Sequence, residues 1–283
     1  MRRRSITLLC AAILLLLAIF FFLTRSSHLR PEPSYQGKPL TAWIAQWGSN
    51  NWSGSTFGSY EAAQQAELAI YNMRADAIPF CLDLIHFQES VVKKKLRSMV
   101  PRRWHAPLHL HDKPWQEIGA MGLCALGTNA APAVPALMEL LSLELTRTKS
   151  DRYLGSLPGH TLGFLGGAAK PAIPLLIESL TNKHAHIQVT AAVTLGTLGL
   201  QPEIVVPALM SFITSQTNAP SGAKCTGILC LQMFGTNASS AAPLVSSFLT
   251  DPDPQVRECA TNTLPYIDWA AAGRANVRIP AKR

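Results

Sequence analysis

The chain has 283 residues, of which 48% are hydrophobic, 7% aromatic and 15% charged, so it can fill a core of domain size and disorder is excluded as the default. Its formal net charge is +8, but 15 of the 25 Lys and Arg residues lie in 1–30, 93–103 and 274–283, which leaves 10 basic against 17 acidic residues elsewhere. This distribution excludes a general polyanion-binding surface, and no nucleic-acid partner is expected.

The N-terminus carries an apolar run. Arginines at residues 2–4 precede residues 6–23, in which only Thr7 and Cys10 are mildly polar. A helix of that length spans about 27 Å, close to the hydrocarbon thickness of a bilayer. We therefore expect residues 6–23 to be a single transmembrane anchor, with residues 1–5 in the cytoplasm and the rest of the chain outside it. The alternative is a cleaved signal peptide, which would make the protein an exported one.

Residues 24–37 are rich in Pro and Ser and predict a linker, and a short helix is expected at about 39–47. A loop rich in Gly, Ser and Asn follows. Aromatic residues gather here, and we expect them to cover the open end of the helices that follow, with a ligand-stacking platform as the alternative. These residues are Trp43, Trp47, Trp52, Phe57 and Tyr60.

A repeated pattern occupies most of the remaining chain. Four times a Leu-Gly or Phe-Gly pair is followed by a Pro eight residues after the Gly, while successive Pro residues are 39, 33 and 36 residues apart. A fixed offset within a drifting period indicates a repeated structural unit. The pairs are Gly127 and Pro135, Gly166 and Pro174, Gly199 and Pro207, and Gly235 and Pro243. The expected units are 59–90, 113–146, 152–181, 185–216 and 222–250, with a closing half-unit at 253–268.

Each unit predicts two helices. An Ala-rich apolar stretch before the Gly has the spacing of a first helix, and the Gly ends it because only Gly adopts a positive φ without cost. Pro132 and Pro171 fit the first position of the second helix, where a backbone N–H is not needed. We expect the two helices to lie antiparallel across a tight turn. Since such a pair cannot bury both apolar faces alone, neighbouring units must stack.

The motif "LGxxAxPAxPxL" between the helices of such a unit resembles a HEAT-type helical repeat. The likeness covers residues 59–90 and 113–268. In the unit that begins at 185, Gln188 stands where the motif has Arg, which puts a continuous Asp/Arg ladder between units in doubt. The residues that match the opening of such repeats are Asp253, Val256, Arg257, Ala260 and Leu264.

The resemblance implies an all-α fold. Residues 38–268 would form an α-solenoid, that is, a HEAT/armadillo-like superhelix. An insert at 91–112 and an irregular basic tail at 269–283 complete this organisation. The piece "YQGKPLTAWIAQW" also resembles the start of bacterial membrane-anchored or exported HEAT repeat proteins of unassigned function. Membership would therefore predict a fold and leave the activity open.

The insert holds the candidate binding residues. A basic cluster with one Trp could contact the phosphates of anionic lipid at the membrane surface, and the alternative is a solvated helix end. Nearby residues are of metal-binding types, but no further ligand from a rigid element is indicated, so no metal site is expected. The basic cluster is Lys93, Lys94, Lys95, Arg97, Arg102, Arg103 and Trp104, and the metal-compatible residues are His105, His109, His111 and Asp112.

The remaining chemistry is sparse. Five cysteines beyond the apolar run lie among apolar neighbours without a CxxC pair, which predicts buried thiols and no disulfide framework. No nucleophile elbow, phosphate-binding loop or acid–base carboxylate pair occurs, so neither a catalytic site nor a cofactor is expected.

The sequence thus predicts a non-enzymatic, membrane-tethered scaffold that binds another protein on the concave face of its solenoid. The alternative is an enzyme of the HEAT-like class, a chromophore lyase or a DNA-base repair protein. That alternative requires residues 6–23 not to be an anchor, because both activities belong in the cytoplasm.

Overall fold

The computed structural model describes residues 30–51, 60–87, 95, 98–100, 114–146, 157–216 and 221–277. The described residues are almost entirely helical, which confirms the all-α class. The apolar run at residues 6–23 lies outside them.

A small hairpin opens the described chain. β1 (Ser34–Tyr35) pairs antiparallel with β2 (Lys38–Pro39), so the end of the segment expected to be a linker is ordered. Gln36 and Gly37 connect the strands at φ 50° and 73°, the positive values that two-residue hairpin turns require.

Three helices follow the hairpin: α2 (Leu40–Asn51), α3 (Tyr60–Asn72) and α4 (Arg74–Ile85). α2 packs against α3, and α4 packs along α6, the first helix of the next unit. Trp43 and Trp47, two of the clustered aromatic residues, are partly buried against the core. The Lys38 ammonium lies 3.8 Å from the centre of the Trp43 ring.

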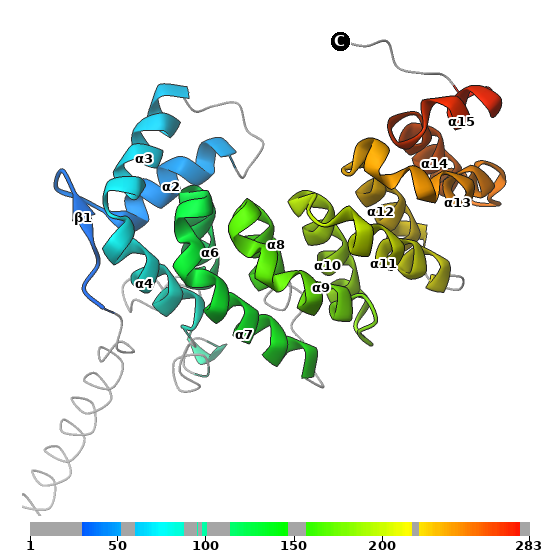
Figure 1. The fold of residues 1–283 in the computed structure, drawn as a ribbon. Helices are drawn as coiled ribbons and strands as arrows, with labels where there is room; N and C mark the ends of the chain where they lie inside the picture. Colours follow the sequence, from blue (N-terminus) through cyan, green and yellow to red (C-terminus); the bar gives the residue numbers. More distant parts are fainter. Residues whose placement is uncertain are drawn as a thin grey trace, which may run out of the picture.

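The repeated units then follow one another along the molecule (Figure 1). Their elements are α6 (Trp115–Leu126), η2 (Gly127–Ala133) and α7 (Val134–Thr146); α8 (Leu157–Phe164), η4 (Gly166–Ala172) and α9 (Ile173–Ser179); α10 (Ala185–Leu198) and α11 (Pro202–Ser215); α12 (Ser221–Gln232), η5 (Gly235–Ala241), α13 (Ala242–Ser247) and η6 (Phe248–Thr250); and α14 (Pro254–Ile267) and α15 (Trp269–Arg274).

Glycine ends the first helix of the four full units, as expected. Gly127, Gly166, Gly199 and Gly235 have φ between 52° and 59°. At Gly127 the φ of 52° is combined with a ψ of −131°, a backbone conformation that residues with an L side chain do not tolerate. Gly199 is an ordinary left-handed C-cap. The sequence pattern therefore located these helix ends correctly.

The prediction that Pro132 and Pro171 begin the second helices is wrong. Each lies inside a seven-residue 3₁₀ segment, and the α-helix starts only after it. The reason is a pair of alanines three and six residues after the Gly, which are buried and hold the chain against the core. A spacing of three matches the three residues per turn of a 3₁₀ helix. The buried pairs are Ala130 and Ala133, Ala169 and Ala172, and Ala238 and Ala241.

The unit 185–216 shows the converse. It has no alanine at either position, since Pro202 and Val205 stand three and six residues after Gly199. Accordingly no 3₁₀ segment intervenes, and Pro202 takes the first turn of α11 directly. In this unit the expected role of Pro holds.

The two helices of a unit do not pack together as the expected antiparallel hairpin. The second helix packs on the next unit instead. Figure 1 shows α7 leading away from the end of α6 and not lying back along it. The most extensive helix contact of each second helix is with the first helix of the following unit: α7 with α8, α9 with α10, α11 with α12 and α13 with α14. In the unit 185–216 no 3₁₀ segment intervenes, yet α11 also packs mainly on α12, so the packing on the next unit does not depend on that segment.

First helices also pack on one another in the order α3, α6, α8, α10, α12, α14, and α6 packs closely on α4, the second helix of the unit before it. Small residues allow the close approach. A Cβ added at Gly196 would lie 3.0 Å from the Cys230 Cβ, and one added at Gly119 would lie 2.5 Å from the Cys81 carbonyl oxygen. The buried side chains of all units form one continuous core.

By length and hydropathy alone, the described stretch Trp115–Thr146 could cross a membrane. Gly127 divides that stretch into α6 and α7, and 44% of its apolar window is buried inside the protein. Its core members, such as Leu123 and Leu137, are fully buried against other helices. We therefore assign this stretch to the helical core.

The tail expected to be irregular over 269–283 begins as a helix, α15. The Asp268 carboxylate accepts hydrogen bonds from the backbone N–H groups of Ala270 and Ala271, at 3.0 and 2.9 Å, and so caps it. Ala271 and Ala272 are buried. An Asp cap followed by three alanines was the signal for this helix.

Candidate protein-interaction surface

The first helices share an exposed face near their C-terminal ends. Its positions lie two and six residues before the Gly that ends the helix, or before Asp268 in α14. One helical turn separates the two positions, so they point the same way. We call this set the first-helix stripe: Met121, Ala125, His160, Phe164, Val193, Thr197, Leu229, Met233, Asn262 and Tyr266.

Large apolar side chains of the stripe are exposed. Met233 is 62% exposed, Leu229 43%, Phe164 50% and Tyr266 49%. Trp269, which begins α15 just after the end of α14, is 68% exposed and extends the same series. Single exposed apolar residues are ordinary, but large exposed apolar side chains recur at the stripe positions in three of the five units, those that begin with α8, α12 and α14. The other two units have the half-buried Met121, Ala125 and Val193 at these positions.

The stripe contains no Asp, Glu, Lys or Arg. Its one histidine is His160, and burial lowers the pKa of this imidazole, which favours the neutral side chain. The second helices differ, because each of α7, α9 and α11 exposes a glutamate: Glu139, Glu178 and Glu203. The two kinds of helix therefore present surfaces of different chemistry.

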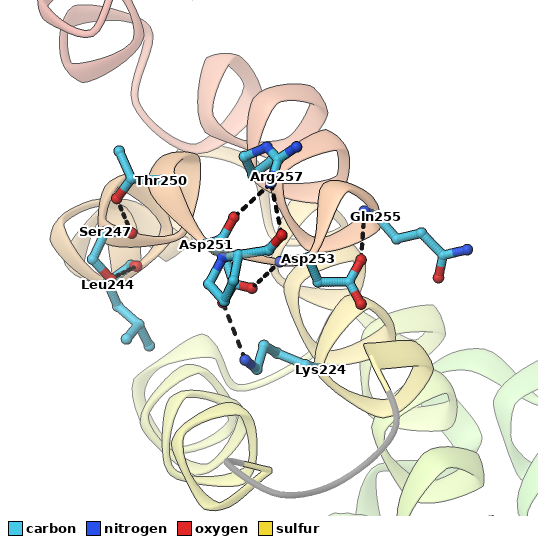
Figure 2. A network of polar contacts seen from close by, with 9 residues as sticks. Lys224, Leu244, Ser247, Thr250, Asp251, Asp253, Gln255 and Arg257 are labelled. Atoms are coloured by element: carbon cyan, nitrogen blue, oxygen red, sulfur yellow. Dashed lines mark hydrogen bonds and ion pairs between the residues drawn. The ribbon is translucent and has the colours of Figure 1, made fainter.

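A polar network fixes the turn that precedes α14, the first helix of the closing unit (Figure 2). The Asp251 carboxylate accepts a hydrogen bond from the N–H of Asp253 at 2.9 Å and forms an ion pair with Lys224 of α12 at 3.1 Å. The Arg257 Nη1 donates to the carbonyl oxygens of Asp251 and Pro252, at 2.8 and 2.9 Å. The backbone bond from Asp253, and then Lys224, lower the pKa of Asp251.

The unit 185–216 keeps an equivalent of this network despite its departure from the motif. The Gln188 Nε2 donates to the carbonyl oxygen of Asn182 at 2.7 Å, across the same six-residue separation as Arg257 and Asp251. The Asn182 side chain accepts from the N–H of His184 at 2.9 Å, as Asp251 accepts from Asp253. Gln188 thus replaces Arg locally, with one amide hydrogen bond where Arg257 makes two.

The cysteines are buried thiols for the most part, as the sequence predicted. Cys81, Cys124, Cys225 and Cys230 are buried and Cys259 is half-buried, and all five are free. Burial raises the pKa of each of the four buried thiols to about 12. A protonated, buried thiol is a slow nucleophile, and in the folded protein these side chains pack as small apolar groups.

Most candidate residues of the insert lie outside the described residues. Among the basic cluster only Lys95 is described, as an exposed helical residue whose carbonyl oxygen accepts a hydrogen bond from the Ser98 hydroxyl at 2.7 Å. Within the described part of the chain, His, Cys, Asp and Glu side chains form no group of three that could hold a metal ion. The insert residues outside that part are Lys93, Lys94, Arg97, Arg102, Arg103, Trp104, His105, His109, His111 and Asp112.

Comparison with known proteins adds no family, because no family model and no curated protein matches the chain. Two crystal structures of engineered proteins from the Northeast Structural Genomics Consortium are similar to it at 17% sequence identity. One similarity covers 81% of this chain and 96% of the other, with a TM-score of 0.43. The second covers 84% and 71%, with a TM-score of 0.42. At these scores the similarities carry no argument about fold or function.

Proposed function

We propose that the chain is a membrane-tethered α-solenoid of HEAT-like units that binds another protein along the first-helix stripe and catalyses no reaction. Residues 6–23 form the anchor in this proposal, and the helical units lie outside the cytoplasm. The observation that carries it is the stripe itself: it has no Asp, Glu, Lys or Arg, and it exposes large apolar side chains in three of its five units, with Met233 and Tyr266 among its most exposed members.

The chemistry of the stripe supports a protein partner. The central parts of protein interfaces are depleted in charged residues and enriched in aromatic residues and Met. Met is also unbranched and flexible, so it adapts its shape to a partner surface. A nucleic acid or another polyanion would instead require Lys and Arg, which the stripe lacks.

The packing of the units supports an extended binding surface. Each first helix packs on the first helices before and after it, so that every added unit lengthens the surface without a separate core. The likeness to HEAT repeats, carried by Asp253, Val256 and Arg257, agrees with this arrangement. The HEAT assignment remains part of the proposal.

A lipid contact completes the proposal. The basic cluster of the insert, from Lys93 to Arg103, meets the anionic membrane surface to which residues 6–23 hold the chain. Each basic group near such a surface contributes on the order of 1 kcal/mol. Together, the anchor and the insert would keep the solenoid close to the bilayer.

Site-specific photo-cross-linking in the native membrane tests the proposed binding surface. A photoreactive amino acid is placed at Met233 in the stripe, and at Ile204 as the control, which is 44% exposed on α11, a second helix. We expect one discrete cross-linked protein from position 233 and none from position 204. The same product from both positions, or none from position 233, contradicts the proposal.

The side of the membrane is tested separately with a reporter fused after residue 283. The proposal predicts activity only for a reporter that works outside the cytoplasm. A reporter active only inside the cell would refute the anchor with this orientation. It would also favour the alternative, an enzyme of the HEAT-like class acting in the cytoplasm.

A further inference from the structure

Helices α12 and α14 lie side by side in parallel register. The Ser221 hydroxyl donates to the Gln255 side-chain oxygen at 3.2 Å, across 34 residues. One helical turn further along each helix, Cys225 and Cys259 stand at the same offset of 34 residues. α14 is the most extensive neighbour of α12 in the described structure. The Ser221–Gln255 contact and this packing set the register that brings the two cysteines opposite one another, and the Cys259 thiol is among the groups that raise the pKa of Cys225.

The two thiols differ in accessibility. Cys225 is buried, whereas Cys259 is half-buried and is the more exposed of the two residues. The other described thiols have different surroundings. Cys124 has Thr161 and Cys81 near it, and Cys230 lies under Gly196 of the preceding unit.

We propose that Cys225 and Cys259 are a redox pair whose disulfide joins α12 to α14. The oxidant is a disulfide of the glutathione class or of a thiol–disulfide oxidoreductase. The Cys259 thiolate attacks one sulfur of the donor and displaces its first thiolate, which leaves a mixed disulfide on Cys259. Cys225 then loses its proton to solvent and attacks the Cys259 sulfur, releasing the second donor thiolate. Two protein thiols are oxidised to one disulfide, and the donor disulfide is reduced to two thiols.

The surroundings of Cys225 favour the oxidised pair. Burial first, then the hydrogen bond and charge of Cys259 and the nearby carboxylates of Asp253 and Asp251, raise the pKa of Cys225 to about 12. Strongly oxidising disulfides occur in sites that stabilise a thiolate and thereby stabilise the reduced form of the pair. The site of Cys225 disfavours the thiolate, so the reduced form gains no such stabilisation here. The Cys225 thiolate is also a poor leaving group when the disulfide is attacked. We therefore expect the disulfide to form slowly and to resist reduction.

The disulfide would fix α12 against α14, the helices that carry Leu229 and Tyr266 of the stripe, and Met233 follows directly after α12. It would hold the spacing of these side chains constant. The inference depends on the packing of the two helices and on neither the membrane anchor nor the proposed partner. Its failure would therefore leave the proposed function standing.

The test uses the purified full-length protein in detergent, reduced and then incubated with glutathione disulfide. Peptide mapping of the alkylated protein identifies which cysteines become linked. We expect one peptide pair that joins Cys225 to Cys259, with a rise of about 5 °C or more in the melting temperature. Cys259→Ser and Cys225→Ser should abolish both changes. Cys230→Ala, which removes a buried thiol from the same helix α12, should abolish neither.

Two results would overturn the inference. One is a protein that carries glutathione on Cys259 and no link to Cys225 after prolonged incubation, since the second step would then not occur. The other is a link that persists in Cys259→Ser or joins a different pair of cysteines. The mapping reads the linkage directly, so these outcomes are decisive even if a variant melts at a lower temperature than the wild type.

Discussion

Single polar side chains fix the entry to the first helices. Arg257 closes the turn before α14 with two hydrogen bonds to carbonyl oxygens, and Gln188 closes the equivalent turn before α10 with one. The sequence motif treats Gln188 as a departure, but the geometry shows that its amide reaches the equivalent carbonyl. What the turn requires is a long side chain with an N–H donor, and the charge is secondary.

This predicts a graded response to substitution at Arg257. Arg257→Ala removes both donors and should lower the free energy of unfolding by about 1–2 kcal/mol. Arg257→Gln should lose less than half of that, because it restores the arrangement found at Gln188. Urea denaturation measures both values, and Arg274→Ala, at an exposed arginine of α15, should stay within about 0.5 kcal/mol of the wild type. An equal loss for Ala and Gln at position 257 would show that the charge, not the donor, is required.

Asp251 makes part of the stability dependent on pH. The hydrogen bond from the Asp253 N–H, and then Lys224, lower the pKa of this carboxyl below its ordinary value of 3.8. A lowered pKa in the folded state contributes stability that is present above pH 3.8 and is lost as the pH falls through the folded-state pKa.

The matching variant is Asp251→Asn, which keeps a side-chain acceptor for the Asp253 N–H but cannot ionise. We expect the wild type to be the more stable protein at pH 7, and the difference in unfolding free energy to shrink as the pH falls from about 5 to below 3. Urea denaturation at a series of pH values measures this difference. A difference that stays constant over that range would mean that the ionised carboxylate contributes nothing.

At the scale of the elements, the spacing of small residues decides both turns and packing. The Gly residues that end first helices were predictable because a positive φ is a local demand, as Gly127 and Gly199 show. The Pro pattern does not predict the 3₁₀ segments, because a Pro at position 132 also fits the first turn of an α-helix. The spacing of Ala130 and Ala133 carried the signal, but only tertiary burial makes that spacing meaningful.

The close packing of α6 on α4 predicts a strong effect of Gly119→Ala. The added Cβ would lie 2.5 Å from the Cys81 carbonyl oxygen of α4, a backbone atom that cannot move independently. We expect a loss of about 3 kcal/mol in the free energy of unfolding, measured by chemical denaturation. Gly222→Ala in α12 is the matched control, because nothing lies within 4 Å of its Cβ.

For Gly222→Ala we expect the free energy of unfolding to rise, the opposite of the change expected for Gly119→Ala. Alanine has the higher helix propensity, so this variant should gain about 0.5–1 kcal/mol. If Gly119→Ala is as stable as the wild type, α4 and α6 are not packed as closely as described. If Gly222→Ala is as damaging as Gly119→Ala, the loss does not come from the contact between helices.

Over the whole molecule, each unit packs on its neighbours in the chain, and the stripe runs along the first helices of successive units. The stacking was predictable, because two amphipathic helices cannot bury both apolar faces alone. The sequence contains the stripe positions, since Phe164 and Met233 each stand two residues before a Gly that ends a first helix, but it does not predict that these side chains are exposed. Their exposure depends on which face each first helix buries, and that is set by contacts between units.

The central claim, that the first-helix stripe binds a protein, is tested most directly by the size of the native complex. Met233→Lys places a charge on the stripe, and Ile204→Lys places the same charge on a second helix; both positions are exposed, so each variant should fold with close to wild-type stability. Native gel electrophoresis of gently solubilised membranes compares the two variants with the wild type. We predict that the wild type and Ile204→Lys migrate as one larger complex and that Met233→Lys migrates as the free chain. A complex that survives Met233→Lys, or that is lost equally in both folded variants, would contradict the account.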